Sequence, residues 1–278
     1  GDVYKRQDET QISRTKSQTT VYLQLLGSDP ICMGENAAKA VALGARGIDL
    51  NFGCPAKVVN RRGGGASLLK NPEQLYTIVT SVRQALPEHI PVTAKMRLGY
   101  DDQSLAQDNA LAIQHAGASW ITIHARTKQD GYRPPAYWEA LAPISENLDI
   151  PVIANGEIWN IEDYFICRER SQCDDVMLGR GAMVTPDLAL QIKAALAGAD
   201  YQKMTWERII NELEKLYQLM WTEPLFDNKY IAPRLKLWVK WLMPNYTQAE
   251  QLFDQLKVIK DPDEAISLIK TSDVSDKG

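Results

Sequence analysis

The sequence predicts an α/β fold of the (β/α)8 barrel type, followed by a small bundle of helices. Three observations predict it. Between residues 20 and 199, short runs of β-branched or apolar residues alternate with longer segments of helical period, as parallel strands joined by helical crossovers do. A polar or chemically reactive residue stands near the end of each run. Beyond residue 200 the runs stop, and only the helical periodicity continues.

Six of these runs are predicted to be strands. An open, doubly wound sheet would bind a ligand mainly at one switch point, whereas a barrel gathers the carboxyl ends of all its strands at one mouth. Polar residues at the end of every run therefore favour the barrel. Because a complete barrel has eight strands, we expect these runs to be strands 3 to 8 of an N-terminally truncated chain. The predicted strands are residues 20–26, 47–52, 91–98, 120–125, 150–154 and 175–178.

Local start signals mark the helices. Residues 71–73 (NPE) supply an N-cap, a proline at the first helical position and an acid in the first turn, and residues 185–187 (TPD) repeat the device. After the barrel, apolar residues at helical spacing predict helices at residues 203–221, 229–243, 247–257 and 262–271.

Three segments are therefore expected along the chain. Residues 1–19 are polar, aperiodic and poor in core-forming residues, and we expect them to be a non-native or disordered leader. Residues 20–199 are expected to form the barrel, and residues 200–278 a separate helical domain.

The composition is that of an ordinary globular protein. The chain has 278 residues, of which 45% are hydrophobic and 24% charged, which excludes a disordered or collagen-like protein. No apolar run approaches the roughly 20 residues of a membrane span, and no signal peptide opens the chain, so we expect a cytoplasmic protein. The four cysteines form no CxxC pair, and no two histidines share a metal-ligand spacing, so we expect no bound metal.

Cys54 is the first candidate for chemistry. It stands in a tight loop directly after the second predicted strand, in residues 51–55 (NFGCP), where the barrel mouth would lie. A thiol at such a place can act as an acid or as a nucleophile. An isolated cysteine is more often a small buried hydrophobe, but the loop position reverses that preference. Residues 63–65 (GGG) follow, and by themselves they indicate no more than a turn that lets backbone N–H groups approach a ligand.

Polar residues near the ends of later strands extend the candidate site. Lys95 lies inside a predicted strand, and it faces either the barrel interior, where it needs an electron-rich partner, or the solvent. His124 closes the next strand, although a lone histidine is more often structural. Residues 155–157 (NGE) and 179–181 (GRG) end the last two strands, where barrels commonly bind phosphate. A phosphate-bearing cofactor is therefore indicated, with plain glycine turns as the alternative.

One helix of the C-terminal part carries a local excess of positive charge, although the whole chain has a net charge of −4. Basic and aromatic side chains together suit a nucleic-acid backbone with exposed bases, and a solvated helix face is the alternative. The basic residues are Lys229, Arg234, Lys236 and Lys240, beside Trp238 and Trp241.

Taken together, the motifs resemble those of the dihydrouridine synthases, flavoenzymes that reduce uridines in tRNA. The resemblance covers residues 20–270. It is carried by residues 23–27 (LQLLG), 49–55 (DLNFGCP), 63–69 (GGGASLL), 95–99 (KMRLG), 124–127 (HART), 155–158 (NGEI) and 179–182 (GRGA). Residues 155–159 (NGEIW) and 234–238 (RLKLW) resemble the bacterial subgroup that acts on uridine 16 of the D-loop.

The resemblance implies a site and a reaction. Reduced FMN would give a hydride to C6 of the uracil, Cys54 would protonate C5 as general acid, and NADPH (or NADH) would reduce the flavin again. FMN would be held by Gln24, Lys95, His124, Asn155, Glu157, Gly179 and Arg180. The tRNA would be contacted by Asn51, Arg97, Arg126, Tyr132, Arg234, Lys236 and Lys257. The target base must be unstacked to reach a barrel mouth. We expect a monomer that binds tRNA, with no metal and no membrane partner.

Two other functions stay open on the sequence. An FMN barrel oxidoreductase acting on a small molecule would need no basic helical domain. A tRNA-binding protein without catalysis would need neither Cys54 nor Lys95 at strand ends. The family opens with a strand that contacts the flavin and a second strand, and this sequence shows neither. The expected truncation therefore keeps a catalytically inactive tRNA-binding fragment among the alternatives, because an open arc of strands would leave part of the flavin site exposed.

Overall fold

The computed structural model describes residues 20–222 and 227–272, so the leader expected at residues 1–19 lies outside the described residues. The chain divides into two compact units. Within the described part, the first unit holds residues 20–157 and 165–177, and the second holds residues 158–164 and those from 178 onward. Among the described residues, no helix combines the length and the apolar character that crossing a membrane requires.

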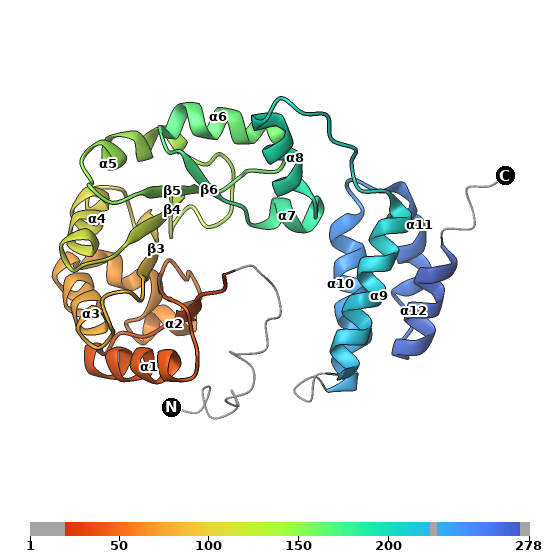
Figure 1. The fold of residues 1–278 in the computed structure, drawn as a ribbon, viewed down its shortest axis with the longest axis horizontal. Helices are drawn as coiled ribbons and strands as arrows, with labels where there is room; N and C mark the ends of the chain where they lie inside the picture. Colours follow the sequence, from red (N-terminus) through yellow and green to blue (C-terminus); the bar gives the residue numbers. More distant parts are fainter. Residues whose placement is uncertain (1–19, 223–226, 273–278) are drawn as a thin grey trace. The chain divides into compact units, whose positions relative to one another are not determined.

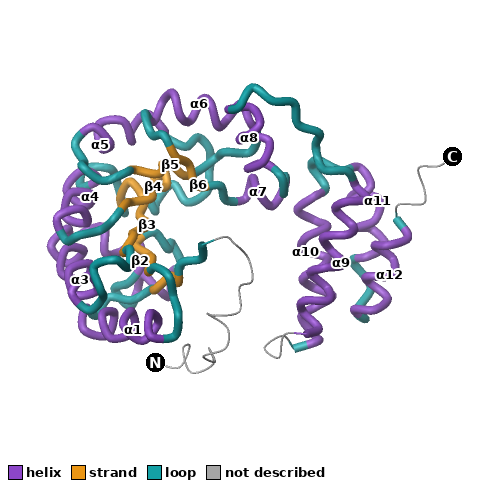
Figure 2. Tube along the Cα trace, in the orientation of Figure 1, coloured by secondary structure: helices purple, strands orange, loops and turns teal. Residues whose placement is uncertain are grey.

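The first unit is built on one parallel sheet of six strands, as predicted. The strands lie in chain order, β1-β2-β3-β4-β5-β6, with β1 and β6 at the two edges. The order never reverses, so the sheet has no switch point of the doubly wound kind, and the barrel-type arrangement is confirmed. Figure 2 shows the strands inside an arc of helices. Their bounds are β1 Leu23–Leu25, β2 Ile48–Phe52, β3 Val92–Gly99, β4 Trp120–Thr127, β5 Val152–Asn155 and β6 Asp175–Met177.

Short helices connect these strands. Proline at the first helical position starts α1 and α3, and the preceding Asp29 and Asn71 cap them by accepting hydrogen bonds from main-chain N–H groups, as the NPE signal predicts. The helical segments are α1 Pro30–Ala42, α2 Lys57–Arg61, η1 Gly65–Lys70, α3 Pro72–Gln84, α4 Ala106–His115, η2 Trp138–Leu141 and α5 Ala142–Glu146, and α6 Ile161–Ser171 spans both units.

The two faces of the sheet differ sharply in polarity. One face is apolar and is covered by α1, α3, α4 and α5 (Figure 1). Its buried residues are Leu25, Ile48, Leu50, Phe52, Val92, Ala94, Met96, Leu98, Ile121, Ile123, Ala125, Val152 and Ala154. Because side chains alternate along a strand, the residues between these point to the opposite face, and most of them are polar. A parallel sheet buried on both faces would be apolar throughout, so the polar face indicates a place for a ligand.

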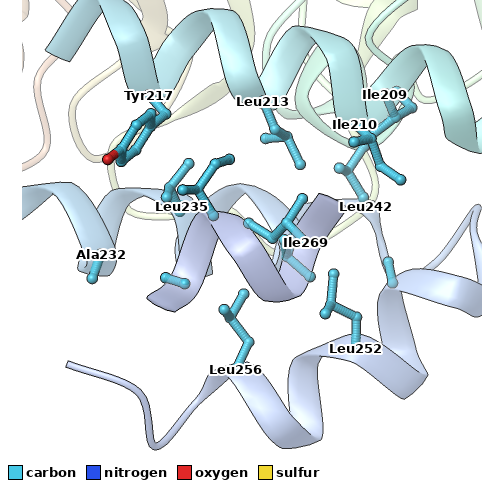
Figure 3. Close-up of a cluster of buried hydrophobic side chains, with 14 of the residues drawn as sticks. Ile209, Ile210, Leu213, Tyr217, Ala232, Leu235, Leu242, Leu252, Leu256 and Ile269 are labelled. Carbon is cyan, nitrogen blue, oxygen red and sulfur yellow. The ribbon is translucent and has the colours of Figure 1, made fainter. Parts of the chain in front are cut away.

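The second unit is helical, and the four predicted C-terminal helices are confirmed. They form a core of buried side chains that includes Leu213, Leu235, Leu252 and Ile269, and Figure 3 shows these converging from α9, α10, α11 and α12. The helical segments are α7 Arg180–Val184, α8 Leu188–Leu196, α9 Trp206–Thr222, η3 Asn228–Tyr230, α10 Ile231–Leu242, α11 Thr247–Leu256 and α12 Pro262–Thr271.

The predicted start of α8 at Thr185 is wrong. The helix begins at Leu188, and the carboxylate of Asp187 accepts hydrogen bonds from the main-chain N–H of Met204 at 2.8 Å and from Gln191. Thr185 instead accepts from the side-chain amide of Asn245 at 2.7 Å. These bonds tie α7 and α8 to the C-terminal helices, which is why the second compact unit begins near residue 178 and not near residue 200.

Truncating Leu235 tests the packing of this helical core. Leu235 is fully buried on α10, so Leu235→Ala removes apolar contacts and leaves a cavity, which should lower the free energy of unfolding by about 2–5 kcal/mol. The matched control is Leu237→Ala on the same helix, where the side chain is 40% exposed and the change should stay within about 0.5 kcal/mol. Urea denaturation followed by tryptophan fluorescence measures both, and equal losses would contradict the assigned core.

Candidate active site

The polar face of the first unit brings together most of the residues predicted for the site. In the strand register, Gln24 pairs with Asp49, and Asn51 pairs with Lys95. One layer further along, Arg97 pairs with His124, which pairs with Asn155. These side chains therefore form adjacent rows near the carboxyl ends of neighbouring strands, where barrel enzymes build their active sites.

The loop that carries Cys54 is held at both ends of that residue. The side-chain Oδ1 of Asn51 accepts hydrogen bonds from the main-chain N–H groups of Gly53 at 3.1 Å and Cys54 at 3.0 Å. The carbonyl oxygen of Cys54 accepts from the side-chain amide of Asn60 at 2.9 Å and from the main-chain N–H of Ala66 at 3.1 Å. The thiol is half-buried and is not in a disulfide. The main chain thus fixes the position of Cys54.

Gly65 allows a close approach of the next turn to this loop. Its φ is +60°, in the region that favours glycine. A side chain there would place a Cβ 2.8 Å from the carbonyl oxygen of Cys54 and 3.0 Å from its Cβ. The last glycine of the GGG motif is therefore a packing requirement of the Cys54 loop.

Lys95 points to the polar face of the sheet, which decides between the two predicted orientations. Its ammonium donates to Oδ1 of Asn155 at 3.1 Å, and Asn155 in turn donates to the carbonyl of Met177 at 2.8 Å. Burial lowers the pKa of Lys95 from 10.5 to about 8; the cation of Arg97 adds to this shift, and the carboxylate of Asp49 opposes it. A half-buried ammonium whose bonded partner is a neutral amide suits an electron-rich ligand.

Arg97 is buried and holds three loops together. Its guanidinium donates to the carbonyl oxygens of Gly53 at 2.9 Å, Thr127 at 3.0 Å and Gly131 at 2.9 Å. Burial lowers its pKa, while the neighbouring Tyr132 opposes that shift. The predicted direct contact between Arg97 and tRNA would require leaving these carbonyls, so the arrangement favours a positioning role. Tyr132 itself is exposed, and its ring lies 5.2 Å from the Arg97 guanidinium.

Arg126 and Glu157 form an ion pair on the same unit. The guanidinium of Arg126 is fully buried and donates to Oε1 of Glu157 and to the carbonyl of Pro135, both at 3.0 Å, while its Nη2 has no hydrogen-bond partner. Glu157 has a φ of 55°, which places its side chain in a left-handed turn after β5. The predicted FMN residue Glu157 and the predicted tRNA residue Arg126 thus contact each other.

Gly156 lets this turn approach His124. Its φ is +115°, and a Cβ there would lie 2.7 Å from Cδ2 of His124. We expect Gly156→Ala to lower the free energy of unfolding by at least about 2 kcal/mol, because backbone strain and a ring clash add. Gly63→Ala is the control: its φ of +74° carries strain, but no atom lies within 4 Å, so about 1 kcal/mol is expected. Urea denaturation compares the two, and an equal cost would show that the clash is relieved.

The remaining predicted residues belong to the second unit. Gly179 precedes α7, and the Arg180 guanidinium lies 5.0 Å from the ring of Trp159. Arg234 is exposed on α10, and Lys236 on the same helix donates to the carbonyl of Lys257 at 3.0 Å. Lys236 and Lys257 therefore lie side by side, as a shared contact with a polyanion requires.

Asp49 and Thr93 were missed by the sequence analysis. The carboxylate of Asp49 accepts from Nε2 of Gln24 and from the hydroxyl of Thr93, each at 2.7 Å. Alternation in residues 48–52 places Asp49 two residues before Asn51, so it shares a face with the polar residues. That spacing was the signal that could have found it. Among the described residues, no cluster of three or more His, Cys, Asp or Glu side chains is arranged to hold a metal.

A parallel sheet of this order, with polar groups and a fixed cysteine loop at its carboxyl ends, defines an α/β-barrel enzyme. The family model described as "Dihydrouridine synthase (Dus)" matches residues 3–276, and the chain belongs to that family. The predicted family is therefore confirmed.

Three curated relatives show how similar this chain is to known members. A tRNA-dihydrouridine(16) synthase of Pseudomonas syringae pv. tomato is 50% identical over 262 residues, covering 94% of this chain and 81% of that protein. Proteins of the same name from Pseudomonas putida and Neisseria meningitidis serogroup A are 47% and 46% identical. They are matched over 88% and 91% of this chain, and over 75% of each relative.

Proposed function

We propose that this enzyme reduces uridine 16 in the D-loop of tRNA to 5,6-dihydrouridine, with FMN as cofactor and NADPH as reductant. The family and the names of its relatives support tRNA as substrate and position 16 as the target. The observation that carries the chemistry is the Cys54 loop, which fixes a thiol beside a polar, ligand-ready face.

The residues of the first unit fit a flavin by their chemistry. Gln24, Asn51, Lys95 and Asn155 present amide and ammonium groups on one face of the sheet, and such groups match the heteroatoms at the polar edge of a flavin ring. We assign cofactor binding to Gln24, Lys95, His124 and Asn155. Glu157 is assigned an indirect part through Arg126, and the assignment of Gly179 and Arg180 to the cofactor phosphate rests on the family resemblance alone.

The reaction adds a hydride and a proton across the C5–C6 double bond of uracil. Bound FMN, reduced by NADPH, would supply the hydride for C6. Cys54 gives the proton from its Sγ to C5, and the main-chain bonds on both sides of Cys54 hold the thiol in place for that transfer. Asn51, Arg126 and Tyr132 position the base, and Arg97 keeps the surrounding loops together.

The direct test uses the chain reconstituted with FMN, NADPH and an unmodified tRNA transcript. We expect a mass increase of about 2 Da, the mass of the two added hydrogen atoms, confined to the fragment that contains position 16. A transcript with cytidine at position 16 should show no increase. Oxidation of NADPH with free uridine or another small enone, in the absence of any change in tRNA, would instead establish the small-molecule oxidoreductase.

Removing a cation from the helical unit tests the RNA contact. Arg234→Ala should weaken tRNA binding and reduce the slope of log affinity against log salt by about 0.7–1, because one phosphate contact is lost. Lys215→Ala is the matched control, since Lys215 is an exposed lysine paired with Glu212 at 2.8 Å on α9. Fluorescence anisotropy with labelled tRNA between about 50 and 200 mM salt gives both slopes. Equal slopes in the two variants would remove Arg234 from the RNA contact.

A further inference from the structure

A continuous chain of side-chain hydrogen bonds leads from β3 to the Cys54 loop. The Thr93 hydroxyl donates to the carboxylate of Asp49 at 2.7 Å, and Nε2 of Gln24 donates to the same carboxylate at 2.7 Å. Oε1 of Gln24 accepts from Nδ2 of Asn51 at 2.8 Å. Oδ1 of Asn51 then accepts from the main-chain N–H of Cys54 at 3.0 Å.

The direction of every bond in this chain follows from its carboxylate. An ionised carboxylate only accepts, so Gln24 must turn its NH2 group toward Asp49 and its oxygen toward Asn51. Asn51 must then turn its own NH2 group toward Gln24, which leaves its oxygen for the loop. We propose that Asp49 is a positioning residue that sets the orientation of both amides and, through them, the main chain at Cys54. The inference rests on the proposed role of Cys54.

Packing alone does not hold Gln24 in this orientation. Gln24 lies on the edge strand β1 and is exposed, whereas Thr93 is buried on β3. Both amide orientations have the same shape, so hydrogen-bond polarity decides between them. The strand register keeps the partners in reach, since Gln24, Asp49 and Thr93 lie opposite one another in three neighbouring strands.

A competing role for Asp49 is its charge, because its carboxylate favours the charged form of Lys95. The two roles separate in the variant Asp49→Asn. The new amide loses the charge but can still accept from Gln24 through its oxygen and donate to the Thr93 hydroxyl, which can accept. Polarity is then kept, and a positioning role predicts a mild effect, whereas a role through charge predicts the full loss seen on removing the side chain.

The variant Gln24→Glu tests the polarity from the other side. It faces the Asp49 carboxylate with a second carboxylate, so the two repel, although the new group could still accept from Asn51. The double variant Gln24→Glu with Asp49→Asn restores every bond: the amide at position 49 donates to the new carboxylate and accepts from Thr93. The single change should therefore disturb the loop, and the double variant should rescue it.

Amide hydrogen exchange of a peptide spanning Gly53 and Cys54, followed by mass spectrometry on the FMN-loaded chain, is the primary measurement. We expect about tenfold faster exchange in Asp49→Ala and Gln24→Glu, and rates within about threefold of wild type in Asp49→Asn and in the double variant. Alkylation by iodoacetamide should accelerate at Cys54 in the same two disturbed variants, while Cys32, exposed on α1, reacts unchanged as an internal control.

Asp149→Ala is the matched control variant. Asp149 accepts from Nε2 of Gln114 at 3.2 Å, in an Asp–Gln pair of the same unit that lies before β5 and outside this chain of bonds. Unchanged exchange in Asp49→Ala, or failure of the double variant to rescue Gln24→Glu, would overturn the inference. Because exchange and alkylation need no tRNA, they stand even if dihydrouridine formation fails, so the inference and the proposed function can fail separately.

Discussion

Replacement of Cys54 by alanine is expected to lower the rate of tRNA reduction by about 10²–10⁴-fold while leaving FMN bound. The thiol is the proton donor in the proposed reaction, and general acids contribute rate enhancements of this size. The loop should survive the change, because the bonds that fix it involve the main-chain N–H and C=O of residue 54 and not the sulfur. Single-turnover reduction of tRNA, with flavin absorbance recorded on the same sample, measures both properties.

Two controls accompany this prediction. Cys32→Ala removes the exposed thiol of α1 and should reduce tRNA at the wild-type rate. Cys54→Ser keeps the shape of the side chain but replaces the thiol by a much weaker acid, so it should resemble Cys54→Ala. Full activity in Cys54→Ala would remove the thiol from the mechanism.

The second large effect concerns Lys95 and pH. The folded chain releases the Lys95 proton at a pKa of about 8, whereas the unfolded chain keeps it up to 10.5. Between these values the unfolded state binds more protons, so this group makes the flavin-free protein more stable as the pH rises from about 8 to about 10. If the ammonium holds FMN, flavin affinity should fall over the same rise in pH. Stability and cofactor affinity would thus change in opposite directions.

The variant Lys95→Met tests both trends. It should weaken FMN binding about 10–100-fold, the value of a hydrogen bond to a charged group, and it should flatten the rise in stability between pH 8 and pH 10. Lys39→Met, which replaces an exposed lysine of α1, should change neither. Flavin titration by fluorescence quenching and urea denaturation across this pH range supply the measurements. A stability profile of Lys95→Met that parallels the wild type would assign the pH dependence to another group.

The strands were predictable because two periodicities coincide in this sequence. Apolar residues alternate with polar ones in residues 48–52 and again in residues 120–127, and glycine or proline lies near each run. Alternation also identified Lys95, His124 and Asn155 as residues that could share a face. The parallel register then brought them together without any information beyond strand order.

Roles within the site were harder to predict, because they depend on hydrogen bonds between residues far apart in the chain. Sequence position gave Arg97 the same standing as Tyr132, yet the structure buries one against three carbonyls and exposes the other. Asp49 was passed over because a carboxylate inside a strand carries no motif of its own. The start of α8 was mistaken because the partner of Asp187, the main chain at Met204, lies 17 residues away.

The guanidinium of Arg97 joins the loop after β2 to two points of the loop after β4. Loops of a barrel are usually regarded as independent modules that can be lengthened or exchanged one at a time. Here an insertion near Thr127 or Gly131 would pull on the carbonyl of Gly53, the residue beside the proposed proton donor. Grafting a loop from a relative onto this scaffold should therefore succeed only when both loops are transferred as a pair.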